Sequence, residues 1–208
     1  MTVISIPCMG SVCTGFLTSL LALERPAGTP IVVSESSLIY NARNTLGQRA
    51  LDMGAERILW LDSDMKFDAD LFDRLSADLD AGMEYVCGIY FSRSAPVKPV
   101  IYKALEFHHN AEENTIEPVA VRYNDYPRDS VFEIKASGFG AVMMTTDAYK
   151  RVLDKFGQPF QPMLGLGEDL AFCQRAGDLG IKMYCDSRAK VKHIGLAEYG
   201  EQQYLEGE

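Results

Sequence analysis

Two aspartates separated by one serine are the first residues of this sequence whose types and spacing suit chemistry. Asp62 and Asp64 come directly after the apolar run RILWL at residues 57–61, which predicts a buried strand. Carboxylates this close repel each other unless a positive group lies between them, and a divalent cation with its preference for oxygen ligands meets that need. A solvated turn carries the same pattern, but ligands in α/β sheets bind at strand ends. We therefore expect Asp62 and Asp64 to bind a metal.

A second acidic pair, Glu168 and Asp169, opens a predicted helix after the segment GLG at residues 165–167. Acids in the first turn of a helix are common because they complement the helix dipole. A carboxylate placed in a catalytic site can also act as a general base. Both interpretations stay open, and so does the choice between the two carboxylates.

His193 lies in the segment VKHIG, which we expect just beyond the last strands. A lone histidine is usually a hydrogen-bonded surface or core residue. Together with an acidic pair, it would complete a mixed oxygen and nitrogen site suited to Mn²⁺ and compatible with Mg²⁺.

Arg43 lies in the helix after the second predicted strand, and Arg93 follows a later one. Each is either a surface charge or a planar donor that neutralises and orients a diphosphate. The adjacent His108 and His109 lie in a polar stretch and are expected to face solvent.

The elements that would position these residues alternate between strands and helices, which favours a mainly parallel sheet. Beyond Arg93 the pattern changes to extended segments typical of antiparallel or edge strands, with an exposed loop expected over residues 108–114. The sequence thus predicts one α/β domain in which helices flank a mainly parallel central sheet, with a small antiparallel element. Strands are predicted at residues 3–6, 31–33, 57–61, 85–90, 138–144 and 182–185, extended segments at 97–102, 119–123 and 131–135, and helices at 16–21, 36–53, 70–79, 146–156 and 168–179, with a mobile loop at 157–167.

Length and composition limit the function classes. A chain of 208 residues suits a single domain. The net charge of −9 disfavours tight binding to a nucleic acid backbone. The apolar start contains Pro7 and Gly10 and has no basic residue before Arg25, unlike a secretion signal. Five cysteines without a C-x-x-C pair are expected to be reduced thiols. We expect a soluble, cytoplasmic protein with no membrane span.

The motifs taken together resemble GT-A-fold glycosyltransferases similar to family 2, with a Rossmann-like sheet, and in particular compact members from phages and bacteria. The resemblance covers about residues 3–195 and depends on the order and spacing of its motifs more than on any one of them. The motifs are SIP at 5–7, SLIYNARN at 37–44, LWLDSD at 59–64, GEDLAFCQRA at 167–176 and VKHIG at 191–195.

This resemblance implies a nucleotide-diphosphate sugar donor, most often UDP-linked, with the metal between its two phosphates. Asp64 would be the direct metal ligand, Asp62 would contact the ribose or the metal, and His193 would complete the coordination. Asp169 would act as the inverting base, with Glu168 as the alternative. Residues 1–92 would form the nucleotide-binding half and residues 93–208 the acceptor half. Pro7, Ser34, Arg43 and Arg93 would lie against the nucleotide.

The acceptor stays open between a glycan, a protein and a modified DNA base. A Rossmann-like enzyme using another nucleotide cofactor is an alternative, but PCMGS stands at residues 7–11 where a G-x-G-x-x-G motif would follow the first strand. A nucleotide-sugar or carbohydrate-binding module without turnover is the third possibility. The joint presence of Asp62, Asp64, Asp169 and His193 speaks against that module.

Overall fold

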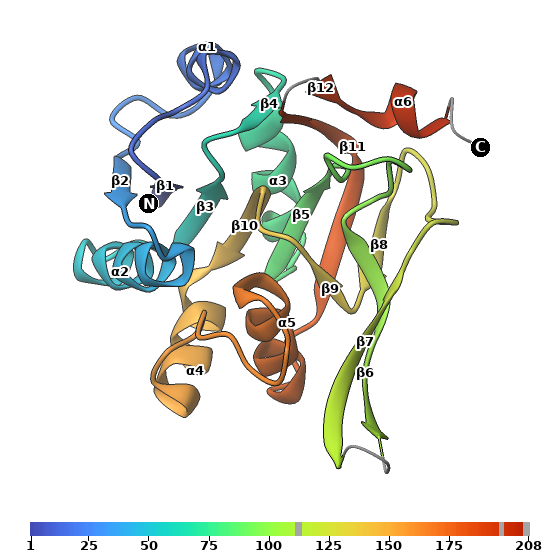
Figure 1. The fold of residues 1–208 in the computed structure, drawn as a ribbon. Helices are drawn as coiled ribbons and strands as arrows, with labels where there is room; N and C mark the ends of the chain where they lie inside the picture. Colours follow the sequence, from blue (N-terminus) through green and yellow to red (C-terminus); the bar gives the residue numbers. More distant parts are fainter. Residues whose placement is uncertain (111–113, 196–197, 206–208) are drawn as a thin grey trace.

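A mixed α/β fold is built around one large sheet (Figure 1). The computed structural model describes residues 1–110, 114–195 and 198–205. The sheet is nine-stranded, with the order β12-β11-β5-β10-β3-β1-β2, and β4 and β8 also pair with β11. Its strands are β1 (Thr2–Cys8), β2 (Ile31–Glu35), β3 (Arg57–Leu61), β4 (Met65–Phe67), β5 (Tyr85–Ile89), β8 (Val131–Ile134), β10 (Ala141–Thr145), β11 (Met183–Ile194) and β12 (Glu198–Tyr199).

Most strands in the middle of this sheet run in one direction. β1 is parallel to β2 and to β3, and β5 is parallel to β11. β10 lies between β3 and β5 and is antiparallel to both. The mainly parallel sheet is confirmed, and its parallel strands place their carboxyl ends at one edge.

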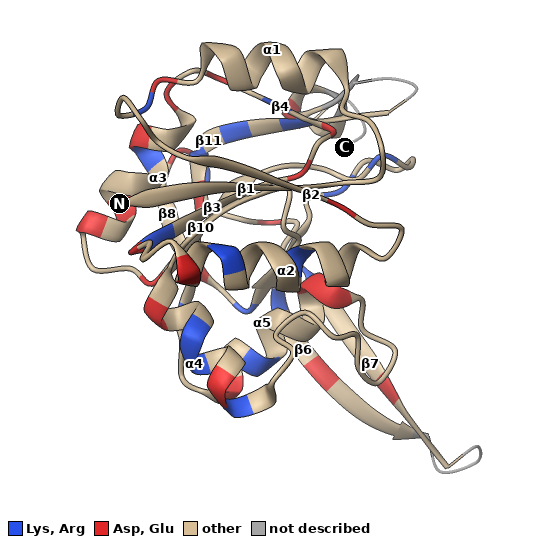
Figure 2. Cartoon of the chain, turned by 90° about the vertical axis from the view of Figure 1, so that its left-hand side faces the viewer, with Lys and Arg blue, Asp and Glu red and all other residues tan. Residues whose placement is uncertain are grey.

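Helices cover both faces of the sheet, which explains why β3 is apolar at successive positions. Ile58 and Trp60 pack on the side of α2, α4 and α5, whereas Leu59 and Leu61 pack on the side of α1 and α3. Figure 2 shows the two helical layers below and above the strands. The helices are α1 (Thr14–Ala22), α2 (Ile39–Asp52), α3 (Leu71–Asp80), α4 (Thr146–Phe156), α5 (Glu168–Asp178) and the short α6 (Glu201–Leu205). No helix of the described residues is both long and apolar enough to cross a membrane.

A small antiparallel sheet extends from the body of the fold as a long hairpin (Figure 1). It has the order β7-β6-β9, with β6 at Ile101–Asn110, β7 at Thr115–Arg122 and β9 at Ala136–Ser137. The antiparallel element is therefore confirmed. The exposed loop expected at 108–114 is wrong in its first part, because residues 108–110 belong to β6; residues 111–113 lie outside the described part of the chain. His108 and His109 are exposed, as predicted.

Several boundaries differ from those expected: β1 is longer than predicted, β10 begins at Ala141 instead of residue 138, and β6 and β7 are longer than the extended segments predicted there. β11 runs to Ile194, so the prediction that His193 lies beyond the last strands is wrong. The long helix begins at Ile39 instead of near residue 36, because the Ser36 hydroxyl accepts the Leu38 N–H within the preceding turn and does not cap the helix. β4, β9, β12 and α6 were not predicted.

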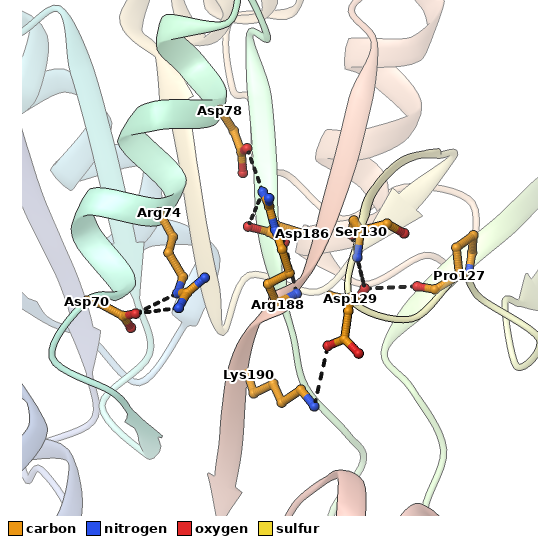
Figure 3. A network of polar contacts seen from close by, with 10 residues as sticks. Asp70, Arg74, Asp78, Pro127, Asp129, Ser130, Asp186, Arg188 and Lys190 are labelled. Atoms are coloured by element: carbon orange, nitrogen blue, oxygen red, sulfur yellow. Dashed lines mark hydrogen bonds and ion pairs between the residues drawn. The ribbon is translucent and has the colours of Figure 1, made fainter.

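A bulge in β11 is held by an ionic network on the face of the sheet covered by α3 (Figure 3). Arg188 donates to both carboxylate oxygens of Asp186, at 2.8 and 3.0 Å, and lies 3.3 Å from Asp78 of α3. Asp186 is fully buried and Asp78 nearly so. Burial and the charge of Asp186, opposed by Arg188, raise the pKa of Asp78 to about 6.

Candidate functional site

The predicted site residues of the first half of the chain gather at the carboxyl ends of β1, β2 and β3. Pro7 and Ser34 are direct neighbours in the β1–β2 register. Asp62 follows β3, and its N–H donates to the carbonyl of Gly140 at 3.1 Å. Gly140 immediately precedes β10, so the antiparallel strand fixes the start of the acidic turn. Parallel strands that end together therefore bring Pro7, Ser34 and Asp62 to one edge of the sheet.

Asp64 contacts residues from the C-terminal part of the chain. β4 pairs with β11, and the Ile194 N–H donates to the Asp64 carbonyl at 2.8 Å. Asp64 Oδ2 lies 3.2 Å from His193 Nε2 and 2.9 Å from the half-exposed Arg93 guanidinium. Burial alone would raise the pKa of Asp64, but the hydrogen bond and charge of His193 and the charge of Arg93 outweigh it and lower that pKa. Asp64 is thus held as a carboxylate.

His193 has an oxygen acceptor at each ring nitrogen. Nδ1 lies 3.2 Å from the carbonyl of Phe91, and Nε2 faces Asp64. A neutral imidazole carries one N–H and cannot donate to both acceptors. The arrangement is satisfied by a doubly protonated ring, or by a cation between Nε2 and Asp64. In protein metal sites, a backbone acceptor on the second nitrogen is the usual way to fix a ligating histidine.

The Asp64–His193 pair fits a divalent ion. Ligands about 2.1 Å from one ion and at right angles to each other are about 3 Å apart, close to the 3.2 Å measured here. Among the described residues, no group of three or more His, Cys, Asp and Glu side chains is arranged to hold a metal ion. Asp62 points to a different partner, so its part in a metal site stays a prediction.

That partner is Arg43, which is buried, with only 3% of its side chain exposed. Its Nη2 donates to both oxygens of Asp62, at 2.9 and 3.2 Å, and its Nε lies 3.5 Å from Glu168. Burial, opposed by Arg43, raises the pKa of Asp62 to about 6. Burial also disfavours the charge of Arg43, but the carboxylates around it keep its pKa above the usual value. The interpretation of Arg43 as a surface charge is therefore wrong.

One part of the Arg43 guanidinium lacks a protein acceptor. The group packs near the rings of Phe139 and Phe160, at 5.1 and 5.8 Å from their centroids. Its buried Nη1 and Nε have no hydrogen-bond partner among the described residues, although Nε lies 3.5 Å from Glu168. A buried donor without an acceptor costs free energy, so Nη1 would be satisfied by an oxygen-rich ligand at the sheet edge.

Asp169 lies beside this cluster at the start of α5. Its carboxylate accepts the N–H of Leu170 at 2.7 Å. Burial first, and then the charge of Glu168, raise its pKa. Glu168 lies against Arg43, whereas the described contacts of Asp169 leave its second oxygen open. Of the two acids, Asp169 is therefore the better placed to accept a proton.

Three residues of the site were missed by sequence reasoning: Tyr90, Phe91 and Gly140. The Tyr90 hydroxyl accepts the Gly140 N–H at 3.4 Å. Burial and the charges of Asp169 and Asp62 raise its pKa well above the usual value, so this phenol stays protonated beside the acidic cluster. Tyr90 and Phe91 directly follow β5, so the rule that led to Asp62 also predicts them.

No protein-family model and no curated protein matches the chain. Solved structures do, and A197 from STIV is one of them. A197 matches with a TM-score of 0.66 and 19% identity, over 93% of this chain and 85% of that chain. At this identity the likeness shows the fold alone. Since one fold supports many activities, function has to be argued from the site.

Proposed function

We propose that this chain is a metal-dependent glycosyltransferase of the GT-A type. It would transfer a sugar from a nucleotide-diphosphate donor, most often UDP-linked in the family that the motifs resemble, to an acceptor hydroxyl. The observation that carries the proposal is the meeting of Asp64 and His193, 129 residues apart, at 3.2 Å. They lie at the same sheet edge as Asp62, Arg43 and the acids that open α5. The mixed α/β fold with its mainly parallel central sheet is compatible with the fold part of the proposal.

Asp64 and His193 would hold Mn²⁺ or Mg²⁺, which supplies charge to stabilise the departing diphosphate. Arg43 would donate its free Nη1 to the nucleotide, and Asp62 would orient that guanidinium. Arg93, half-exposed and paired with Asp64, would turn to a phosphate oxygen once Asp64 binds the ion. Pro7 and Ser34 would border the nucleotide at the ends of β1 and β2.

Asp169 would act as the general base of an inverting transfer. The acceptor oxygen attacks the anomeric carbon while its proton passes to the Asp169 carboxylate. The bond between that carbon and the diphosphate oxygen breaks, and its electron pair leaves with the diphosphate. A raised pKa in the free carboxylate makes Asp169 a stronger base than an exposed aspartate. Glu168, held by Arg43, would position the guanidinium.

The test measures thermal stabilisation by a panel of nucleoside diphosphates that includes UDP, with and without Mn²⁺, followed by release of UDP from UDP-sugars. We expect stabilisation that requires Mn²⁺, and slow Mn²⁺-dependent hydrolysis that Asp64→Ala and His193→Ala abolish. His108→Ala, which changes an exposed histidine, is the matched control and should keep both. Absence of stabilisation by every nucleotide would refute the proposal. Binding without turnover on any acceptor would favour the binding module instead.

A further inference from the structure

A pocket of about 550 Å³ lies at the far end of α5 from Glu168. Its walls come from the last turns of α5, the segment 180–183, β6 and β8. At the rise of an α-helix, Glu168 and Gly177 are about 13 Å apart along α5. We call the group of Asp62, Asp64, Glu168 and Asp169 the carboxylate site. None of these residues lines the pocket. Its volume falls within the roughly 300–1,000 Å³ of small-molecule sites.

Gly177 lines this pocket and has no side chain to fill it. In the interior of a helix, glycine is less favourable than every residue except proline. The φ of Gly177 is not positive, so the backbone does not require glycine. A Cβ at Gly177 would meet no heavy atom within 4 Å, so close packing does not require it either. Gly47 of α2 differs, because its Cβ would lie 2.1 Å from the ring of Tyr149. Glycine at Gly177 therefore weakens the helix, and neither the backbone nor the packing requires it. Such a departure from local preference is expected at functional positions.

The rim of the pocket carries equal numbers of positive and negative side chains. Glu133 lies between two lysines, with both Lys135 Nζ and Lys182 Nζ 3.6 Å from its oxygens. Lys103, Glu106 and Asp178 complete the charged lining, which gives three cations and three anions. Such a rim gives no net attraction to an ion. Ammonium donors beside carboxylate acceptors suit hydroxyl groups, each of which both donates and accepts.

Apolar surface in the pocket comes from β6, where Ala104 and Leu105 are half-buried. Ile134, Ile181 and Met183 also line the pocket but are only 2–3% exposed, so they offer a ligand little surface. A ligand for this pocket therefore presents hydroxyl groups on one side and C–H groups on the other, as a sugar ring does.

We propose that the pocket at the end of α5 is a second ligand site, which binds a neutral saccharide. Its hydroxyl groups bind Lys135, Lys182 and Glu133, and its C–H face lies on Leu105 of β6. This inference does not depend on the proposed transferase activity, because the pocket requires neither nucleotide nor metal.

The experiment measures saturation-transfer NMR and calorimetric binding of neutral sugars to the full chain. The panel contains glucose, galactose, mannose, N-acetylglucosamine, maltose, cellobiose and lactose. We expect at least one to bind with a Kd of about 1 mM or tighter, and Gly177→Leu to weaken it about tenfold or more. Gly177→Ala, which adds one methyl group and favours the helix, should keep most of the binding. Circular dichroism of both variants checks the fold.

Three results would overturn the inference. They are failure of every sugar of the panel to bind, binding to Gly177→Leu equal to that of the wild type, and preference for glucuronate or glucose 6-phosphate over neutral sugars. Asp64→Ala separates this proposal from the transferase, since it should lose Mn²⁺-dependent hydrolysis and keep saccharide binding. Loss of binding in Asp64→Ala would place the sugar at the carboxylate site and refute a second site.

Discussion

Replacement of Arg43 by methionine tests the central electrostatic feature of the site. Methionine keeps an apolar stem against Phe139 and Phe160 but removes the charge between Asp62 and Glu168. The Arg43 side chain is 3% exposed and that of Asp62 is 23% exposed, so water cannot replace the lost guanidinium fully. Breaking a buried ion pair on one side costs about 3–5 kcal/mol. We expect a loss of that size in the free energy of unfolding.

The double variant Arg43→Met/Asp62→Asn separates the pair from the packing. Removing both charges leaves no uncompensated carboxylate at Asp62, so the loss should be smaller than the sum of the two single losses. Contacting charged residues show coupling energies of about 0.5–3 kcal/mol, and we expect a value near the upper end. Urea denaturation gives each free energy by linear extrapolation, with the m-value as the check on two-state unfolding.

Arg49→Met is the matched control, because Arg49 is an exposed arginine of the same helix that donates to the Val33 carbonyl at 3.2 Å. Its loss should stay near 0.5 kcal/mol, as for most surface changes. If Arg43→Met costs no more than Arg49→Met, or if the double variant is additive, Arg43 is not the counter-charge of the buried acids.

Two further changes test the elements around the site. Gly47→Ala places a Cβ 2.1 Å from the Tyr149 ring, so we expect a loss of about 1–3 kcal/mol from overpacking, measured by urea denaturation. Asp78 has a pKa of about 6 when folded against about 3.9 unfolded, so its ionisation destabilises the fold. The free energy of unfolding of the wild type should rise relative to Asp78→Asn as pH falls from 7 to 4, by at most about 3 kcal/mol. The exposed Asp73→Asn on the same helix should show no such change, and equal pH dependence of both variants would contradict the burial of Asp78.

The parts of the fold that were predictable carry their information in local pattern. β3 was predicted with its observed bounds, because four successive apolar residues between a turn and an acidic pair suit a strand buried on both faces. α4 was also predicted with its bounds, since the Thr145 side chain caps its first turn and Gly157 ends it with a φ of 75°. The position of Asp62 at a sheet edge followed from the rule on strand ends.

The parts that were not predictable depend on partners far away in the sequence. The apolar sequence of β10 does not determine its direction, because an apolar strand is buried equally well whether it runs parallel or antiparallel to its neighbours. The burial of Arg43 depends on Asp62 and on Glu168, 125 residues further along the chain, and no helical pattern shows that. β11 is different, because exposed Arg188 and Lys190 alternate with buried Ala189 and Val191. That period of two predicts a strand that continues beyond residue 185, although polar residues interrupt the apolar run.

The charges of the site explain why a cation and a nucleotide would have to act together there. Four carboxylates, those of Asp62, Asp64, Glu168 and Asp169, face two guanidinium groups, Arg43 and Arg93, which leaves a formal charge of −2 before any proton on His193. A diphosphate entering alone would meet this negative charge in a partly buried setting, where repulsion is poorly screened. A divalent ion at Asp64 and His193 would cancel it and free Arg93 for a phosphate oxygen. The same acidic cluster that holds the ion would therefore exclude the nucleotide until the ion is bound, which is why the Mn²⁺ requirement for stabilisation by UDP is the decisive measurement.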